Sequence, residues 1–343
     1  MDEFGGWDMP IQYTGILQEH NHTRTKASVF DICHMGEFEL SGASALADLE
    51  RLLTCNIGNL AVGQVRYGFI LNDAGGVIDD LTCYRLDVER YMLVVNAGTA
   101  PADAEWIKEH ISPETCFTDL SAAMAKLDIQ GPKSRDVLED VLGCALPDLG
   151  YFRVKEFEAM EASGILSRTG YTGEWGYEIY LPNEVAGSLW NKILEHELAA
   201  PGGLGARDTL RLEMGYPLYG HELSASRTPV ATSRGAFIDL KKDFIGKAGV
   251  QADLDNSEII LVGLRFDSKR AAREHDKVYY NEVEVGEVTS GSLAPSLGVA
   301  VAMAFVQSDL SEIGQMLQVD IRGKKFAAEV VGLPFYKNGT ARG

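Results

Sequence analysis

The apolar pattern of the chain changes at about residue 259, and this change limits the possible folds more than any other feature. Upstream, segments that alternate polar and apolar residues, such as 65–71, are interleaved with segments of helical spacing, such as 44–53. Downstream, short β-type stretches up to residue 331 are separated by polar or glycine-containing turns. That second pattern is typical of a small antiparallel barrel or sandwich. We therefore expect an α+β front portion and an all-β C-terminal portion.

The length of 343 residues allows two or three domains with sizeable cores. No low-complexity linker marks a boundary, and we place it so that residues 1–235 form the α+β region and residues 236–343 form the β-rich domain. Within the α+β region, helical spacing predicts further helices at 102–111, 133–142, 185–198 and 206–214.

The charge of the chain excludes several classes of partner. There are 31 Lys and Arg residues against 50 Asp and Glu residues, a formal net charge of −19. Nucleic acids and anionic membrane surfaces would be repelled by this charge unless a basic patch were strongly segregated. The longest nearly unbroken apolar run, 297–306, is far shorter than the roughly 20 residues that a membrane-spanning helix needs. We therefore expect neither nucleic acid nor membrane as a partner.

Cysteine usage and the first residues favour a cytoplasmic protein. The five cysteines contain no CxxC pair and are most simply reduced thiols. Residues 1–3, Met-Asp-Glu, are acidic and do not resemble a secretory signal. The seven histidines form no HExxH motif, and the glycines at 202–205 follow neither the GxGxxG nor the P-loop order. We therefore expect no metal site and no nucleotide cofactor.

Two adjacent aspartates follow a strong turn signal. The turn 72–76, Asn-Asp-Ala-Gly-Gly, separates two strand-like segments, and Asp79 and Asp80 lie in the second of them. Because neighbours on a strand point to opposite faces, the two carboxylates cannot line the same surface. Two interpretations remain open: an ordinary hairpin with solvated acids, or one aspartate that faces a cavity and acts as a base.

A glycine-rich loop and a charged helix supply two more candidate residues. Glu178 follows the loop 170–176, and its carboxylate could accept two parallel N–H bonds from a flat heterocycle. A plain hairpin with an exposed glutamate fits the same pattern equally well. Further along, Arg207 and Arg211 share one face of the predicted helix 206–214. That helix is either simply solvated, or it carries an arginine that binds a ligand carboxylate or carbonyl.

These segments occur along the chain in a particular order together with several further motifs. The further motifs are Phe4–Tyr13, Val29–Gly36, Leu71–Leu81, Val94–Ala97, Ile129–Pro132, Gly170–Glu178, Gly205–Glu213, Asp243–Lys247, Thr289–Gly291 and Leu333–Tyr336. In this order they resemble the aminomethyltransferase, or T-protein, family of the glycine cleavage system over almost the whole chain. Each motif alone is weak, but the ordered set is specific.

The resemblance implies a three-lobed, cloverleaf-like fold. Two interleaved α+β lobes would surround a central folate cavity, with the inserted lobe at roughly residues 38–117, and an antiparallel β-barrel would follow. It also implies the reaction, in which an aminomethyl group on the lipoyl arm of the carrier H-protein passes to tetrahydrofolate. Ammonia is released and 5,10-methylenetetrahydrofolate is formed. Tetrahydrofolate is the co-substrate, and no metal, flavin or nicotinamide is expected because there is no redox change.

The resemblance also assigns roles to single residues of this sequence. Asp80 would be the catalytic carboxylate beside the folate nitrogens, Glu178 the pterin ligand, and Arg207 a further folate contact. The remaining expected cavity-lining residues are Asn96, Tyr67 and Met35.

Two rival functions share this fold. A tetrahydrofolate-dependent demethylase of a sulfonium or aryl-ether substrate would need folate but no lipoyl carrier. A folate-binding iron–sulfur assembly factor would carry a cysteine where this chain has 242–246, Lys-Asp-Phe-Ile-Gly. We therefore rank the demethylase as the alternative to aminomethyl transfer.

Overall fold

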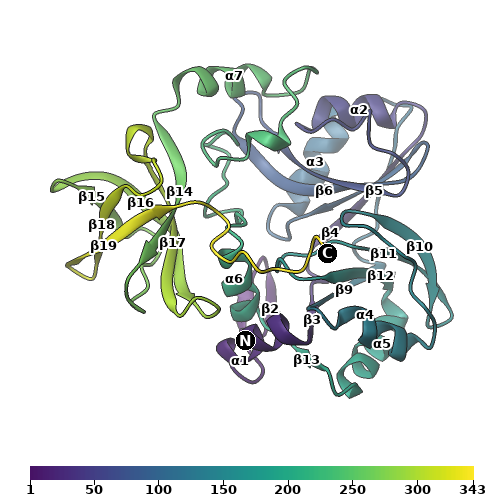
Figure 1. The fold of residues 1–343 in the computed structure, drawn as a ribbon. Coiled ribbons are helices and arrows are strands. Elements are labelled where there is room, and N and C mark those ends of the chain that lie inside the picture. Colours follow the sequence, from purple (N-terminus) through teal and green to yellow (C-terminus); the bar gives the residue numbers. More distant parts are fainter.

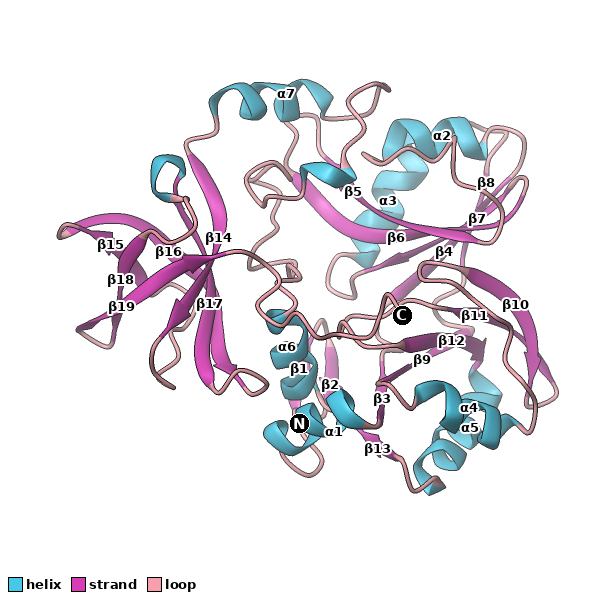
Figure 2. Ribbon diagram, viewed as in Figure 1, coloured by secondary structure: helices cyan, strands magenta, loops and turns pink.

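The computed structural model describes all 343 residues and contains two large open β-sheets and one closed β-barrel (Figure 1). The barrel stands to one side, and the two open sheets lie one above the other on the opposite side (Figure 2). The expected α+β class with a C-terminal antiparallel barrel is confirmed.

A six-stranded sheet is built from strands that lie far apart in the sequence. Its order is β10-β11-β12-β9-β3-β13, and only the edge pair β13–β3 is parallel. The strands are β3 (Ala27–Asp31), β9 (Met124–Gln130), β10 (Val154–Ala159), β11 (Ala162–Ser167), β12 (Gly176–Pro182) and β13 (Ala199–Pro201). Helices α4 (Ser134–Leu142) and α5 (Asn183–Glu195) pack on one face, where Leu138, Leu189 and Ile193 meet Ile129 and Ile179.

A five-stranded antiparallel sheet is inserted between β3 and β9, which is what interleaves the two lobes. Its order is β5-β6-β7-β4-β8. The strands are β4 (Gly36–Ser41), β5 (Gln64–Leu71), β6 (Val77–Asp87), β7 (Arg90–Val95) and β8 (Cys116–Asp119), and the helices are α2 (Ala45–Leu52) and α3 (Ala100–His110). Leu49 and Ile107 of these helices are buried against Leu81 and Leu93 on the outer face of the sheet.

The inner faces of the two sheets meet in a small mixed core. Tyr84 and Met92 of the five-stranded sheet pack with Ile165 and Tyr180 of the six-stranded sheet. Successive side chains of a strand point to opposite faces, so each strand sends one residue toward the helices and the next into the space between the two sheets. Polar side chains on these inner faces are therefore buried between two lobes rather than exposed to solvent.

The C-terminal barrel closes through the pair β14–β19. Its order is β14-β17-β16-β15-β18-β19, with strands β14 (Ile259–Phe266), β15 (Lys277–Tyr280), β16 (Val283–Ala294), β17 (Val299–Gln307), β18 (Met316–Ile321) and β19 (Lys324–Val331). Full closure leaves no unpaired strand edge. The barrel strands begin at Ile259, while α7 (Lys247–Asn256) packs through Val250 on Phe69 and Val77 of the five-stranded sheet. The boundary at residue 236 remains a prediction.

Several elements had no clear signal in the sequence. The buried side chains of α1 (Ile16–Thr25) are Glu19, His20 and Thr23, so this helix lacks an apolar stripe. The short strands β1 (Asp2–Phe4) and β2 (Trp7–Met9) form a hairpin. The helix predicted at 206–214 is present as α6 (Leu204–Glu213), which packs against both α1 and β16. No helix has both the length and the apolar character required to cross a membrane.

Candidate functional site

Asp80 lies on the inner face of β6, at the centre of a network of polar side chains. The Tyr67 hydroxyl donates to Asp80 Oδ2 at 2.8 Å, and Asn96 Nδ2 donates to Asp80 Oδ1 at 2.9 Å. Asp79 is fully buried on the other face of the strand, where it accepts hydrogen bonds from the Asn96 backbone N–H at 2.9 Å and from Nδ2 at 2.7 Å. The two carboxylates thus lie on opposite faces, as strand geometry predicts, and Asn96 links them at the sheet edge.

A third buried carboxyl group, that of Asp103, lies near this network. Asp103 of α3 is fully buried, and its oxygens have no hydrogen-bond donor among the side chains around it. Burial, together with the negative charge of Asp79, raises the pKa of Asp103 to about 9. At neutral pH Asp103 is therefore mostly a neutral acid, which lowers the cost of burying it near Asp79.

Asp80 is poised to exchange a proton near neutral pH. Burial first, and the charge of Asp79 second, raise the pKa of Asp80 to about 7, while the hydrogen bonds from Tyr67 and Asn96 oppose the shift. A carboxyl group whose pKa lies near the working pH is well matched to general acid–base catalysis. The Tyr67 ring itself is held by edge contacts with Phe69 and Phe237, with ring centres 5.2 Å and 4.8 Å away.

Glu178 on β12 is held in place through one of its two carboxylate oxygens. Oε2 accepts hydrogen bonds from Tyr84 at 3.0 Å, from Tyr180 at 3.2 Å and from the Thr169 hydroxyl. Burial opposes ionisation, but the charge of Lys126 and the hydrogen bond from Thr169 outweigh it and lower the pKa of Glu178. Oε1 accepts no hydrogen bond within the protein, so an ionised acceptor remains open to a ligand.

Arg207 and Arg211 of α6 have separate partners. Arg207 Nη1 donates to Asp128 Oδ2 at 2.8 Å, and its guanidinium carbon lies 5.1 Å from the ring centre of Tyr171. Arg211 is buried and pairs with Asp208 and Glu222. The interpretation of this helix as simply solvated is therefore wrong, because Arg207 pairs with the buried Asp128 and Arg211, itself buried, pairs with the buried Glu222.

Five of the six predicted residues fall into two groups, one of three and one of two. Tyr67, Asp80 and Asn96 form one cluster, and Met35 and Glu178 both border Lys126, with Met35 Sδ 3.5 Å from Nζ. Asp80 and Tyr84 lie on the same face of β6 four residues apart, about 13 Å along the strand, and Tyr84 contacts Glu178. The roles predicted for these residues and for Arg207 remain predictions.

Sequence reasoning missed several buried polar residues of the same region. Lys126 and Asp128 on β9 alternate with Ala125, Leu127 and Ile129, a pattern that is typical of a strand with one solvated face. In the structure that polar face points between the sheets, and Lys126 and Asp128 are both buried. No strand was predicted for residues 124–130, and the local pattern by itself cannot show that a second lobe covers this face.

Glu37 on β4 was also missed. It is fully buried, and neither carboxylate oxygen has a hydrogen-bond partner. Burial raises the pKa of Glu37 to about 8, the positive charge of Lys126 opposes the shift, and the charge of Glu178 adds to it. At neutral pH Glu37 is therefore mostly a neutral acid beside the Lys126–Glu178 pair.

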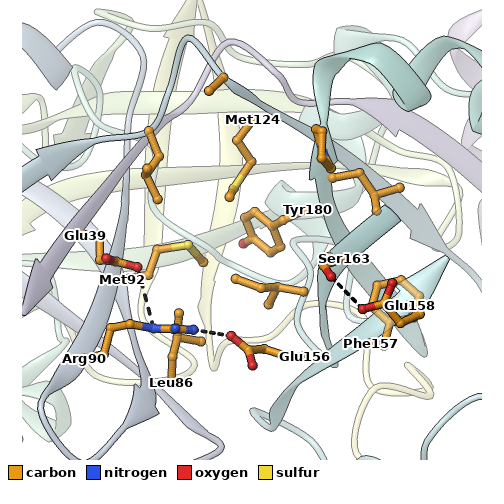
Figure 3. A pocket seen from close by; sticks show the side chains of 16 residues that line it. Glu39, Leu86, Arg90, Met92, Met124, Glu156, Phe157, Glu158, Ser163 and Tyr180 are labelled. Atoms are coloured by element: carbon orange, nitrogen blue, oxygen red, sulfur yellow. Dashed lines mark hydrogen bonds and ion pairs between the residues drawn. The ribbon is translucent and has the colours of Figure 1, made fainter. Parts of the chain in front are cut away.

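A cavity of about 500 Å³ opens between the two sheets on the other side of Tyr180 (Figure 3). Its apolar floor includes Met92, Met124 and Tyr180, and Arg90 bridges Glu39 and Glu156 at its edge (Figure 3). Of the predicted site residues, none lines this cavity. No group of three or more His, Cys, Asp or Glu side chains is arranged to hold a metal ion.

Two family models together match almost the whole chain. The GCVT N-terminal domain matches residues 1–242, and the glycine cleavage T-protein C-terminal barrel domain matches residues 260–337. The chain is 40% identical to an aminomethyltransferase of Desulfitobacterium hafniense, over 98% of this chain and 93% of the relative. It is 43% identical to an aminomethyltransferase of Saccharopolyspora erythraea, over 98% of this chain and 94% of the relative.

A solved structure matches the fold equally well. The glycine cleavage system aminomethyltransferase T from Bartonella henselae superposes with a TM-score of 0.93 at 34% sequence identity. The match covers 99% of this chain and 94% of that chain. The three lobes are therefore arranged in the same way in both proteins.

Proposed function

Since this chain belongs to the glycine cleavage T-protein family, we propose that it transfers an aminomethyl group to tetrahydrofolate at the site between its two sheets. The donor is the aminomethyl-bearing lipoyl arm of the carrier H-protein. Its C–S bond breaks and leaves a dihydrolipoyl thiol on the carrier, and the other products are ammonia and 5,10-methylenetetrahydrofolate. The observation that carries the proposal is that two different carboxyl groups lie on the facing sides of the two sheets. Glu178 is ionised and has one oxygen without a hydrogen bond, and Asp80 has a pKa near 7.

Asp80 supplies the proton transfer. The attacking nitrogen of tetrahydrofolate loses a proton as its new bond to carbon forms, and Asp80 accepts that proton. The same negative charge stabilises positive charge that develops on the transferred carbon. Tyr67 and Asn96 hold the carboxylate in one orientation, so little reorganisation is needed during the reaction.

Glu178 and Arg207 hold the folate. The free Oε1 of Glu178 accepts an N–H from the pterin, while Oε2 remains bound to three hydroxyl groups. Arg207 is half-buried beside the Tyr171 ring and contributes positive charge toward the anionic part of the substrate. Asn96, Tyr67 and Met35 line the folate cavity in this proposal. The five free cysteines support a cytoplasmic location.

An assay of the two possible reactions tests the proposal. Purified protein is incubated with aminomethyl-loaded H-protein and tetrahydrofolate, and both ammonia and 5,10-methylenetetrahydrofolate are measured. A parallel incubation replaces the carrier with a sulfonium methyl donor. We expect products only from the first incubation, since the relatives are aminomethyltransferases. Demethylation without aminomethyl transfer would establish the rival function instead.

A further inference from the structure

Lys126 is a buried cation without an adequate acceptor. Its side chain is only 2% exposed, and its ammonium hydrogen-bonds only the thioether of Met35, with Nζ 3.5 Å from Sδ. The nearest carboxylate oxygen, Glu178 Oε1, is 3.7 Å from Nζ, beyond hydrogen-bond distance. A thioether is a weak acceptor, so the ammonium keeps unsatisfied donors in a place where water has little access.

Lys126 and Glu178 Oε1 therefore present a donor beside an acceptor. Both groups lie on the inner face of the same sheet, since Lys126 on β9 is directly opposite Tyr180, two residues from Glu178 on β12. The Glu178 side chain is 10% exposed, so the pair is not completely sealed from a ligand. A donor next to an acceptor matches a cyclic amide, in which a ring N–H lies next to a carbonyl oxygen.

We propose that Lys126 is a specificity-determining residue, which donates a hydrogen bond to the ring carbonyl of the bound pterin while Glu178 Oε1 accepts the adjacent ring N–H. The proposal rests on the proposed function, because it assumes that tetrahydrofolate binds at Glu178. It adds a new role, which is selection of 4-oxo over 4-amino pteridine rings. In a 4-amino ring, a donor replaces the carbonyl and would face the ammonium, so Lys126 rejects it.

A purely structural role for Lys126 makes a different prediction. Lys126 also lies near Glu37, and its charge lowers the pKa values of both Glu37 and Glu178. If it served only to neutralise these acids, its loss would weaken the binding of both rings by the same factor. The ratio of the two affinities, rather than either affinity alone, therefore distinguishes recognition from structural support.

The experiment measures tetrahydrofolate and its 4-amino-4-deoxy analogue by calorimetry on the full-length protein. In Lys126→Met we expect tetrahydrofolate to bind about 10- to 100-fold more weakly, with no matching loss for the analogue. The preference for the 4-oxo ring then shrinks by the same factor. An unchanged ratio of the two affinities would overturn the proposal.

A second variant covers the case in which Lys126→Met does not fold. The amide of Lys126→Gln can donate to a carbonyl or accept from an amino group, so we expect tighter binding of the analogue and a smaller 4-oxo preference. A 4-oxo preference equal to that of the unmodified protein would again exclude this role. Lys133→Met is the matched control, because the Lys133 side chain is 49% exposed and pairs only with Asp136; both affinities should stay unchanged.

The unmodified protein separates this inference from the proposed function. If it does not bind tetrahydrofolate at all, both are wrong. If it binds and turns over tetrahydrofolate while the variants keep its 4-oxo preference, only the role of Lys126 is wrong.

Discussion

At the scale of single residues, two hydrogen bonds orient the Asp80 carboxylate. Tyr67 binds one oxygen and Asn96 binds the other, while Asp80 itself remains free to exchange a proton. An asparagine in its place would keep the size, and its Oδ1 could accept from Asn96 while its Nδ2 could donate to the Tyr67 oxygen, but it could not take up a proton. The fold and the catalytic role can therefore be separated at this position.

We predict that Asp80→Asn lowers turnover by roughly 10²–10⁴-fold, the usual contribution of a positioned acid–base group. Tetrahydrofolate affinity should stay within a few fold, because Glu178 and Arg207 are unchanged. Single-turnover formation of 5,10-methylenetetrahydrofolate measures the first quantity, and calorimetry measures the second. Near-normal turnover would remove Asp80 from the mechanism.

The raised pKa of Asp80 predicts a pH dependence of activity. Asp80 must be deprotonated to accept a proton, and burial raises its pKa to about 7. We therefore expect kcat/KM to rise as pH increases through about 7, and to level off above it. A profile that is flat across neutral pH, with chemistry still rate-limiting, would contradict the assignment of Asp80 as the base.

Glu178→Gln tests the second residue of the site. The substitution removes the negative charge and one acceptor oxygen, so we expect tetrahydrofolate binding to weaken by about 1.5–3 kcal/mol, as for a lost hydrogen bond to a charged group. Titration calorimetry at constant salt concentration gives the value. Unchanged affinity would show that the pterin binds elsewhere.

At the scale of secondary-structure elements, the hairpin that carries Asp80 is held down by α7. Its turn is closed by Asn72, whose Oδ1 accepts the backbone N–H groups of Ala74 and Gly76 at 3.0 and 2.9 Å. Gly249 of α7 packs directly on the backbone of Ala74, and a Cβ at position 249 would collide with the Ala74 carbonyl. The absence of a side chain at Gly249 is thus what allows the close approach.

Gly249→Ala should lower the free energy of unfolding by about 1–3 kcal/mol, the usual cost of overpacking a tight contact. Urea denaturation followed by circular dichroism measures it. The matched control is Gly187→Ala in α5, where a Cβ meets nothing within 4 Å. There we expect a gain of about 0.5–1 kcal/mol from the better helix propensity of alanine. Equal effects of the two substitutions would show that the α7 contact is not close in solution.

Strands β9 and β12 show how far strands and their buried faces can be predicted from sequence. The glycine-rich segment 170–176 predicts a loop that leads into a strand, and β12 is present there. No strand was predicted for residues 124–130, which form β9. The alternation of polar and apolar residues on β9 is typical of a strand with one solvated face, whereas Lys126 and Asp128 are buried. Burial of that face depends on a sheet formed by residues between β3 and β9, which no local pattern describes.

At the scale of the whole molecule, the third lobe and the C-terminal segment contribute to the centre. After the barrel, the chain returns to the glycine-rich loop, where the Ala341 backbone N–H donates to Gly173 O at 3.0 Å (Figure 1). The Thr340 hydroxyl donates to Glu174 Oε2 at 2.6 Å, and Arg168 Nη2 donates to the Ala341 carbonyl oxygen at 2.7 Å. The loop that leads into Glu178 is therefore supported by the last residues of the chain.

The net charge of −19 makes local positive charge important for any anionic partner. Lys269, Arg270 and Arg273 are exposed together on the barrel. We predict that the double substitution Lys269→Gln, Arg270→Gln slows association with the H-protein by about three- to tenfold at low salt and flattens the salt dependence of the rate. Stopped-flow fluorescence measures both.

A matched pair of lysines controls for the change in net charge. Lys133→Gln with Lys192→Gln removes the same charge from exposed positions on the six-stranded lobe. Its association rate should stay close to that of the unmodified protein. If both double variants slow association equally, net charge rather than the barrel cluster controls the encounter.

The sequence by itself determined the α+β and barrel regions, most helices and strands, the family, and Asp80, Glu178 and Arg207 as candidates. These features depend on the periodicity of neighbouring residues and on the order of short motifs, and both can be read from the linear sequence. Only the tertiary structure decided that the polar face of β9 is buried, that Lys126 lies beside Glu178, and that Asp103 is buried close enough to Asp79 for the charge of Asp79 to raise its pKa. The physical reason is that burial and pKa depend on residues far apart in the chain, which the interleaving of the two sheets brings together.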